Sequence, residues 1–356
     1  MRTRLLKPFT GMMALLLALV AFAAPVQAKD KFTLAWSIYV GWMPWEYAEK
    51  NGIVKKWADK YGIEIEVVRM NDYIESINQF TAGKFDACMM TNMDALTIPA
   101  AGGVDTTALI VGDFSNGNDA IIVKEGESVK DLAGKTLNLV ELSVSHYALA
   151  RALDMNGMSE QDVSVVNTSD ADMVSIYGTP DIEAVVTWNP MVGEIMERDD
   201  ATIVFDSSQI PGEIIDMTMI NTEVLNKHPE LAKALTGAWY ETMAIMSGDD
   251  EKAKAAKTMM GEESGTDLAG YEAQLAATKM FYSPQEAVDF VTSDALPTTM
   301  ENVATFSFEK GILGEGAGSP EFIGIEFPGG KVYGDKNNIK MRYTDTYMKM
   351  AADGKL

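Results

Sequence analysis

Patterns typical of β-strands and α-helices alternate along this chain, and this alternation constrains its fold more than any other feature. Strand patterns at Phe32–Trp36, Ile63–Val68 and Phe85–Met90 are each followed by a helical pattern. The alternation restarts with the strand pattern Thr136–Val140 and the helical pattern Ser145–Asn156. Strands connected through helices pair in parallel and need helices on both faces of their sheet. The sequence therefore predicts an α/β protein with two lobes and mixed, mostly parallel sheets.

The remaining predicted elements continue this order as far as Thr222, beyond which the chain is mostly helical. Further strands are predicted at Thr107–Val111, Ala120–Val123, Val163–Val166, Glu183–Val186, Thr202–Phe205 and Ile214–Ile220. Further helices are predicted at Met43–Lys50, Met93–Ala101, Asp170–Tyr177, Pro190–Arg198, His228–Ser247, Asp249–Met260, Leu268–Met280, Pro284–Val291 and Pro297–Ile312, and Asp72 is expected to cap another. The tail from Glu315 is rich in glycine and proline, so it is expected to wrap over the surface.

Two polar segments, Gly112–Asp119 and Gly212–Asp216, flank the second block of strands and helices. A chain that leaves one lobe, builds a second lobe and returns to the first needs two such crossings. Two crossings that lie close together form a hinge, whereas two independent domains need only ordinary linkers. The predicted division is lobe one at 29–116 plus 217–314, lobe two at 117–216, and a C-terminal wrapping segment at 315–356. The length of 356 residues also exceeds that of one ordinary hydrophobic core.

The N-terminus has the three parts of a secretory signal peptide. Basic residues without any acid come first, an apolar run follows over Met12–Ala24, and Val26-Gln27-Ala28 offers a small-residue cleavage site. A membrane-spanning helix needs about 20 apolar residues, and this run is shorter. We therefore expect residues 1–28 to be a signal peptide that is cleaved near Ala28, and the mature protein to be in the periplasm.

Charge and composition exclude several classes of function. The net charge of −23 argues against nucleic acid and anionic membrane surfaces as partners. The single cysteine, Cys88, cannot form an internal disulfide and lies in an apolar run, where a buried small side chain is expected. Because the chain has only two histidines, His146 and His228, a zinc cluster is not expected. We expect no metal and no cofactor.

The sequence contains no recognisable constellation of catalytic residues. Ser145 and His146 are neighbours, and neighbouring residues on a helix point apart, so they cannot share a proton as a catalytic triad does. A Gly-x-Ser-x-Gly turn, a phosphate-binding loop and a metal-binding motif are all missing from the sequence. The sequence therefore predicts a binding protein and not an enzyme.

The segment Leu142-Ser143-Val144-Ser145-His146-Tyr147, with the helix that continues to Leu153, resembles a motif of periplasmic substrate-binding proteins of the nitrate/sulfonate/taurine type. In that family the second-lobe helix usually starts with Gly-Ser-x-x-His-Tyr. The downstream Gln161-Asp162-Val163 and the turn Trp188-Asn189-Pro190 also fit, although family members usually have Trp-Asp/Glu-Pro. Leu142 replaces the family's glycine, which lets the backbone approach an oxyanion closely, and this departure weighs against a sulfonate-binding mode.

Two further segments, Trp36–Trp45 and Thr91–Leu96, resemble the subgroup of this family that is associated with urea carboxylase-type enzymes and is described as urea- or guanidine-binding. This resemblance implies the two-lobed type II periplasmic binding fold, with the ligand between the lobes. It also implies a receptor that docks as a monomer on an ABC transporter permease and delivers its solute there.

In open α/β sheets, ligands bind beyond the carboxyl ends of the strands. The segments predicted to lie there are Trp36–Trp45, Thr91–Asp94, Asp113–Asp119, Glu141–Ser145, Thr187–Asn189 and Glu213–Asp216. They contain several carboxylates and aromatic rings but neither lysine nor arginine. An anion such as a sulfonate normally binds arginine or a helix N-terminus, whereas a planar cation binds carboxylate oxygens and ring faces. We therefore expect a planar, nitrogen-rich solute, guanidinium or else urea.

The candidate ligand-binding residues are Trp36, Tyr39, Asn92, Asp94, Asn116, Glu141, Ser143, Trp188 and Asp216. At least one carboxylate must enter the closed cleft to compensate the charge of a buried cation. Asp94 and Glu141 are the first candidates, followed by Asp216, although Asp94 could instead favour the dipole of a helix start. Trp188 and Trp36 are expected to stack on the solute.

Several of these residues have a purely structural alternative. Asn92 and Ser143 are expected to orient the solute through hydrogen bonds, but both could instead cap helices. Asp113 and Asp119 could be solvated turn residues. Trp42 enters a predicted helix, and it is expected to pack in the core.

Two other functions stay open. Receptors of the same family bind taurine, other sulfonates or nitrate, and the lack of basic side chains in the segments above is the feature that separates this chain from them. A pyrimidine-synthesising enzyme belongs to the wider superfamily, but it depends on histidine clusters that this sequence lacks.

Overall fold

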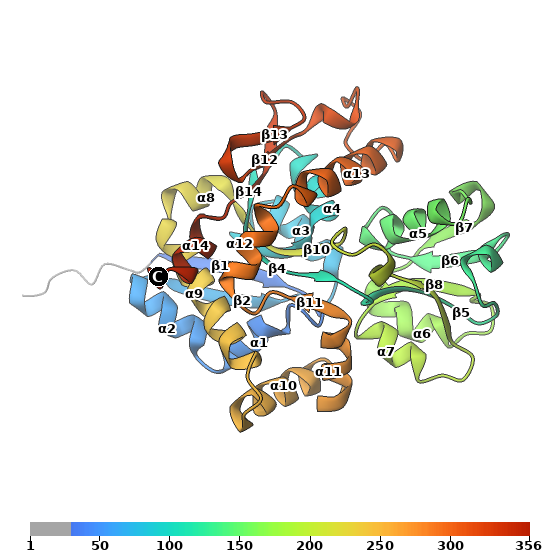
Figure 1. Ribbon diagram of the computed structural model, residues 1–356, viewed down its shortest axis with the longest axis horizontal. Helices are drawn as coiled ribbons and strands as arrows, with labels where there is room; N and C mark the ends of the chain where they lie inside the picture. Colours follow the sequence, from blue (N-terminus) through green and yellow to red (C-terminus); the bar gives the residue numbers. More distant parts are fainter. Residues whose placement is uncertain (1–29) are drawn as a thin grey trace, which may run out of the picture. The chain divides into compact units, whose positions relative to one another are not determined.

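Two β-sheets organise residues 30–356, the part of the chain that the computed structural model describes (Figure 1). Residues Lys31–Leu356 form one unit, and the predicted signal peptide lies outside the described residues. Strands of the first sheet are drawn in both blue and red in Figure 1, whereas those of the second run from teal to yellow-green. The chain therefore builds four strands of the first sheet, then the second sheet, and returns to add the other five strands of the first.

The first sheet has nine strands of mixed direction. Their order is β13-β12-β14-β4-β10-β3-β1-β2, and β11 pairs with β4 off this path. The strands are β1 (Lys31–Trp36), β2 (Glu64–Arg69), β3 (Ala87–Thr91), β4 (Thr106–Ser115), β10 (Ile215–Asn221), β11 (Thr278–Met280), β12 (Gly324–Phe327), β13 (Lys331–Tyr333) and β14 (Ile339–Tyr343). β1 pairs in parallel with β2 and β3, whereas β10 runs antiparallel between β3 and β4. Because β10 is antiparallel, it can return from the second sheet without a crossover helix.

The second sheet has five strands in the order β7-β6-β8-β5-β9. They are β5 (Asp119–Val123), β6 (Thr136–Leu139), β7 (Ser164–Asn167), β8 (Ala184–Trp188) and β9 (Thr202–Asp206). β6 is parallel to β7 and β8, and β5 is antiparallel to β8 and β9. Figure 1 shows α5 (Val144–Met155) on one side of this sheet, and α6 (Met173–Tyr177) and α7 (Met191–Met196) on the other. Two sheets of mixed direction with helices around them are the α/β arrangement that the sequence predicts.

The helices that accompany the first sheet follow the predicted order. They are α1 (Met43–Lys50), α2 (Ile53–Tyr61), α3 (Tyr73–Thr81), α4 (Asn92–Ala95), α8 (Thr222–Lys227), α9 (Pro229–Met246), α10 (Glu251–Glu263), α11 (Leu268–Ala276), α12 (Pro284–Val291), α13 (Ala295–Glu309) and α14 (Thr346–Ala352). Asp72 caps α3 as predicted, because its carboxylate accepts a hydrogen bond from the N–H of Glu75 at 2.8 Å. Every residue of β3 is buried, which explains its continuous apolar run, and Cys88 is buried there as predicted.

The two crossings between the sheets lie side by side. One joins β4 to β5, and the other joins β9 to β10. Ser115 and Ser207, one from each crossing, place their Oγ atoms 2.6 Å apart, and the N–H of Gly117 donates to Ser207 Oγ at 2.8 Å. The N–H of Ser115 also donates to the carbonyl of Ile214 at 3.0 Å. Two hydrogen-bonded crossings form a narrow connection about which the two sheets can rotate.

The first crossing is shorter than the predicted linker Gly112–Asp119. β4 continues through Gly112 and Asp113 to Ser115, and β5 begins at Asp119. Asp113 is part of the strand because it pairs with Asp216 on β10. A pairing of two acids in the interior of a sheet leaves no trace in a hydrophobic pattern, which is why the sequence alone predicted a linker from Gly112 and left a turn role open for Asp113.

Three further segments differ from the prediction. The predicted helix Met93–Ala101 is α4 followed by a π-helical turn, Leu96–Ala100, which contains a proline. The predicted helix Leu268–Met280 ends at Ala276, and β11 follows it. The tail beyond Glu315 does not only wrap the surface, because β14 pairs in parallel with β4 and brings β12 and β13 into the first sheet.

Candidate ligand-binding site

A small cavity, here called the interlobe cavity, lies between the two sheets. It is lined by Tyr39, Trp42, Tyr73, Thr91, Ile214 and Asp216 on the side of the first sheet and by Asp119, Val144 and Trp188 on the side of the second. Thr91 ends β3 and Trp188 ends β8, so the cavity lies where the strands of an α/β sheet usually present a ligand. Its volume is about 20 Å³, slightly more than one water molecule requires. Only a solute of a few heavy atoms fits there without movement of the walls.

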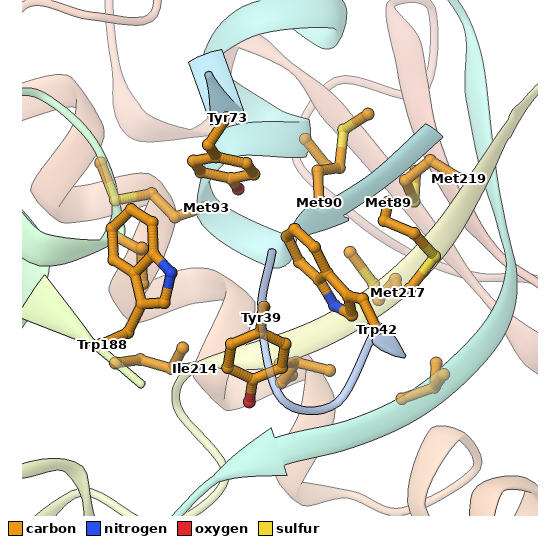
Figure 2. Packing of buried hydrophobic residues seen from close by; sticks show 14 of the residues in the cluster. Tyr39, Trp42, Tyr73, Met89, Met90, Met93, Trp188, Ile214, Met217 and Met219 are labelled. Atoms are coloured by element: carbon orange, nitrogen blue, oxygen red, sulfur yellow. The ribbon is translucent and has the colours of Figure 1, made fainter. Parts of the chain in front are cut away.

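Four aromatic rings surround this cavity and are called the aromatic box: Tyr39, Trp42, Tyr73 and Trp188 (Figure 2). The ring centroids lie 5.1 Å apart between Tyr39 and Trp42 and 5.5 Å apart between Trp42 and Tyr73. The centroids of Tyr73 and Trp188 lie 5.7 Å apart, with the rings edge to face. Tyr73 belongs to α3, a helix that accompanies the first sheet, and Trp188 belongs to β8, a strand of the second sheet. The box is therefore complete only when the two lobes meet.

Asp94 lies directly behind two residues that line the cavity. Its Oδ2 accepts hydrogen bonds from the Tyr73 hydroxyl at 2.6 Å and from Thr91 Oγ1 at 2.8 Å. Within residues 30–356, its Oδ1 has no hydrogen-bond partner. The side chain is fully buried, and this burial raises the pKa of Asp94 to about 6. Asp94 thus fixes the Tyr73 ring and keeps one free acceptor.

Asp113 and Asp216 form a pair of buried carboxyl groups, called the acid pair. They are register partners on β4 and β10, and Asp216 lines the cavity while Asp113 lies behind it. The Tyr39 hydroxyl donates to Asp113 Oδ1 at 3.0 Å. Among the described residues, Oδ2 of each acid lacks a partner. A Cβ at Gly41 would lie 2.5 Å from Asp113 Oδ2, so the pair needs glycine at that position.

Burial dominates the electrostatics of this region. It raises the pKa of Asp113 to about 7 and that of Asp216 well above its ordinary value, with the charge of Asp113 adding to the shift at Asp216. Asp119 begins β5 on the opposite side of the cavity, and burial raises its pKa to about 7 as well. The N–H of Asp119 donates to Ser115 Oγ at 3.1 Å, which holds the residue beside the crossing.

The cavity therefore combines acids and rings without a base. Within the described part of the chain, neither lysine nor arginine lines it. The same residues contain no group of three or more His, Cys, Asp or Glu side chains that could hold a metal ion. Buried carboxylate oxygens without partners are costly unless they are protonated or meet a donor. This arrangement can accept several hydrogen bonds from a small positively charged guest, and its rings can cover the faces of that guest.

The structure brings four of the nine sequence candidates to the cavity or to its walls. Tyr39, Trp188 and Asp216 line it, and Asp94 is hydrogen-bonded to two lining residues. Asn92 is buried close by, but both ends of its amide are used: Nδ2 donates to the carbonyl of Glu213 at 3.0 Å, and Oδ1 accepts from the N–H of Ile215 at 3.1 Å. Asn92 therefore positions the start of β10. It does not cap α4, because that helix begins one residue earlier than expected and Thr91 is its cap.

Two candidates lie away from the cavity. Glu141 is in the exposed turn between β6 and α5, where its N–H donates to the side chain of Asn167 at 3.0 Å. Asn116 is exposed at the crossing, and its N–H donates to the carbonyl of Ala277 at 3.0 Å. The expectation that Glu141 enters the closed cleft is not met in this conformation, because the turn leaves it on the surface.

Trp36 and Ser143 have structural positions near the site. Trp36 is fully buried at the end of β1 and does not line the cavity. Ser143 caps α5, since its Oγ accepts from the N–H of Ser145 at 3.2 Å and donates to the carbonyl of Val140 at 2.7 Å. Through this cap, the next residue, Val144, becomes the part of α5 that lines the cavity.

Four residues of the site were not among the candidates predicted from the sequence: Trp42, Tyr73, Asp113 and Asp119. Trp42, Asp113 and Asp119 lie in segments that were already expected at the carboxyl ends of strands. Because those segments contain neither lysine nor arginine, the sequence could have indicated all three as candidates for binding a cation. Tyr73 follows a helix cap and carries no such signal. Its place in the aromatic box depends on how α3 packs against the second lobe.

Comparisons with known proteins agree with this architecture. The chain is 26% identical over 143 residues to the taurine-binding periplasmic protein of Escherichia coli strain K12, which covers 39% of this chain and 44% of that protein. A binding protein of Brucella abortus strain 2308 is 25% identical over 198 residues, 54% of this chain and 61% of that protein. The chain thus matches about half the length of these curated relatives.

Residues 30–356 contain no helix that is long and apolar enough to cross a membrane.

Solved structures show the same fold. The alkanesulfonate-binding protein SsuA of Xanthomonas axonopodis pv. citri, bound to MOPS, superimposes with a TM-score of 0.67 at 14% identity over 81% of this chain and 96% of that one. The nitrate-binding protein NrtA of Synechocystis PCC 6803 gives 0.64 at 12% identity over 92% and 89%. The desulfurization enzyme DSZB gives 0.55 at 15% identity over 79% and 93%, so the fold alone does not fix the function. The prediction of a two-lobed periplasmic binding fold is confirmed, and, since residues 35–260 match the NMT1-like family, the chain belongs to that family.

Proposed function

We propose that this protein is an exported receptor that captures guanidinium, or else neutral urea, between its two lobes and delivers it to an ABC transporter permease. Membership of the NMT1-like family and the likeness to named periplasmic binding proteins support the receptor class. The single observation that supports this choice of ligand is the composition of the interlobe cavity. Four aromatic rings and buried acids line or adjoin it, and none of its described lining residues is basic.

The geometry of the cavity suits guanidinium in two ways. Its flat π-system can lie against the faces of aromatic rings, as cations do in aromatic cages. Its N–H groups lie in the same plane and can donate to carboxylate oxygens at the edge, in the manner of bidentate arginine–carboxylate pairs. Asp216 and Asp119 line the cavity from opposite lobes and supply those acceptors. A trimethylated ammonium ion has no N–H donor and would leave the carboxylates unpaired.

An anion receptor is the second candidate, because relatives are named for taurine, alkanesulfonate and nitrate. Buried carboxylates would repel such a ligand, and the described cavity offers no basic side chain to offset them. Leu142, which stands at the family's glycine, has a φ of 60° and an exposed side chain in front of α5. The backbone there is less open to an oxyanion than a glycine would be.

Capture requires that the lobes open and close about the two crossings. Several contacts hold the closed arrangement: Ser169 Oγ donates to Asp72 Oδ2 at 3.2 Å, and Asn118 Nδ2 donates to Thr278 Oγ1 at 2.8 Å. An ion pair between Lys310 and Glu160 also joins α13 to the segment after α5. These polar contacts can be replaced by hydrogen bonds to water when the lobes separate, so the closed state can open to exchange solute.

Titration calorimetry of the purified protein at pH 8 tests the proposal. Guanidinium chloride is expected to bind with one site, urea more weakly, and taurine and nitrate not at all. Glu141→Gln is the matched control, because that acid is exposed and does not line the cavity, and this variant should bind as the unmodified protein does. Binding of taurine or nitrate without any guanidinium response would contradict the proposal, and turnover of a solute would indicate an enzyme.

A further inference from the structure

We propose that the acid pair, Asp113 and Asp216, holds one proton in the empty receptor and releases it when a cation enters the cavity. Binding then exchanges one proton for one cation. This inference rests on the proposed function, and it adds a protonation step to the same site.

The geometry brings the two carboxyl groups together. Asp113 and Asp216 are register partners on adjacent antiparallel strands, so their side chains lie on the same face of the sheet. The two carboxyl groups act on each other electrostatically, since the charge of Asp113 raises the pKa of Asp216. Asp216 faces the cavity, whereas Asp113 is held behind it by the hydroxyl of Tyr39 at 3.0 Å. A solute in the cavity therefore meets Asp216 and not Asp113.

The surroundings of the acid pair disfavour two charges. Both residues are at most 2% exposed, and ionising two neighbouring carboxyl groups in such a buried site is strongly unfavourable without a compensating cation. Among residues 30–356, the titratable groups that act on the pair are carboxylic acids or phenols: Tyr39 before α1, Asp119 on β5, Tyr271 on α11 and Tyr282 after β11. The raised pKa values of Asp113 and Asp216 agree with a retained proton.

The exchange keeps the charge of the site constant. When guanidinium donates its N–H groups to Asp216, its positive charge replaces that of the shared proton in balancing the second carboxylate charge of the pair. The proton then leaves to solvent, so no bond other than its O–H bond breaks. Because the cation and the proton compete, the dissociation constant should rise about tenfold for each unit of pH decrease while the pair stays protonated in the empty state.

Calorimetry in buffers of different ionisation enthalpy measures the released proton. Guanidinium chloride is titrated into the protein at pH 7 in phosphate, HEPES and Tris, and again at pH 6. The observed heat should change linearly with the ionisation enthalpy of the buffer, with a slope near one proton per cation, and binding should be about tenfold weaker at pH 6. Urea is the neutral control and should give a slope near zero. Equal heats for guanidinium in all three buffers would overturn the exchange.

Two variants assign the proton. Asp113→Asn can still accept from Tyr39 through its carbonyl, and its amide gives Asp216 a permanent donor. This variant should bind guanidinium with almost no proton release and little dependence on pH. Asp119→Asn is the matched control on the opposite lobe, and it should bind more weakly but still release the proton. If Asp119→Asn abolished the release and Asp113→Asn did not, the proton would belong to Asp119 and the proposal would be overturned.

Carbon-13 NMR of the aspartate carboxyl groups separates this inference from the proposed function. In the empty protein at pH 7, one resonance of the acid pair should report a protonated carboxyl, and Asp113→Asn should remove the pair's coupled titration. Guanidinium binding to a protein whose empty pair is fully ionised would overturn the exchange alone. The absence of cation binding at every pH would overturn the proposed function and the exchange with it.

Discussion

The two walls of the interlobe cavity differ in what they contribute. The wall on the first sheet supplies three of the four rings and Asp216, with Asp113 and Asp94 behind it. The wall on the second sheet supplies Trp188, Asp119 and Val144. The first wall is also more firmly built, since the hydroxyls of Tyr39 and Tyr73 are each fixed by a buried carboxylate.

This difference suggests a division of labour. The first wall sets the charge and shape that the solute must have, and it does so without help from the second lobe. The second wall closes the box and removes the solute from water. Changes on the first wall should therefore affect whether the solute is recognised, and changes on the second wall should affect how long it stays.

The largest effect is expected from Asp216→Asn on the first wall. Loss of the only first-wall carboxylate that lines the cavity among the described residues leaves the buried cation without its nearest partner. We expect guanidinium binding to weaken at least about 100-fold, which corresponds to about 3 kcal/mol. Calorimetry compares this variant with Glu141→Gln. Similar losses in both variants would show that net charge, and not the cavity wall, governs affinity.

The pH dependence of stability should reveal buried acids on both walls. The folded pKa of Asp113 and of Asp119 is raised to about 7, above an unfolded value of about 3.9. The folded state thus retains protons that the unfolded state has lost, so the free energy of unfolding falls as pH rises through 7. Between pH 6.5 and 8 we expect the free energy of unfolding of the empty protein to fall by about 2 kcal/mol, as measured by thermal unfolding.

The range from pH 6.5 to 8 excludes the titration of His146, whose effect on stability has the opposite sign. Burial lowers the pKa of His146 to about 4, so its contribution is lost only as the pH falls below about 6.5. Asp113→Asn should flatten the decline between pH 6.5 and 8. Saturation with guanidinium should flatten it further, because the cation favours the ionised acids. A stability that increases over this range would contradict the proposed protonation of the empty site.

Trp188→Ala tests the second wall. Loss of this ring opens the aromatic box on one side, while the first wall still presents its rings and Asp216. We expect binding to weaken by about tenfold, mainly through faster dissociation, since a cation–π contact contributes about 1–2 kcal/mol when it is desolvated. Stopped-flow measurements of association and dissociation separate the two rates. A loss confined to the association rate would mean that Trp188 takes part in first recognition.

Lys310→Met tests a contact outside the cavity that holds the lobes together. Lys310 on the first-sheet side pairs with Glu160, which also contacts His146 on α5. The side chains of Lys310 and Glu160 are 22% and 25% exposed, so the pair is partly screened by solvent. We expect guanidinium binding to weaken by about two- to fivefold with an unchanged binding stoichiometry. An unchanged affinity would show that the pair does not bias closure.

The smallest effect is expected from Leu142→Gly. Leu142 has a positive φ of 60°, a conformation that costs a non-glycine residue about 1 kcal/mol, and its side chain is 41% exposed. Glycine removes this strain but loses more backbone entropy on folding, so a net gain of about 0.5 kcal/mol is expected in thermal unfolding. If the variant also gained affinity for taurine, the residue would be a determinant against oxyanions.

Most of the fold follows from the sequence because strands and helices differ in hydrophobic period. The apolar runs of β3, β5 and β8 and the cap at Asp72 are local signals, and the structure places these elements where the patterns predict them. The structure of the tail could not be predicted in this way, because β14 becomes a strand by pairing with the distant β4. Such an element depends on a partner more than 200 residues away in the sequence, and short patterns do not contain it.

The site was only partly predictable for the same reason. Residues such as Trp188 and Asp216 stand at the ends of strands, where sequence reasoning can place them. Glu141 stands at a comparable point, yet the turn before α5 leaves it exposed. The pairing of Asp113 with Asp216 depends on β-sheet register between two crossings, and the position of Tyr73 depends on contact between lobes. These are tertiary properties with no periodic signature.

A crystal structure of the protein with guanidinium at pH 8 shows whether the interlobe cavity binds a flat cation. We expect a flat ligand inside the aromatic box, with its edges within hydrogen-bonding distance of Asp216 and Asp119. An empty cavity in crystals soaked with guanidinium, or a sulfonate bound in front of α5 when taurine is supplied instead, would contradict this expectation.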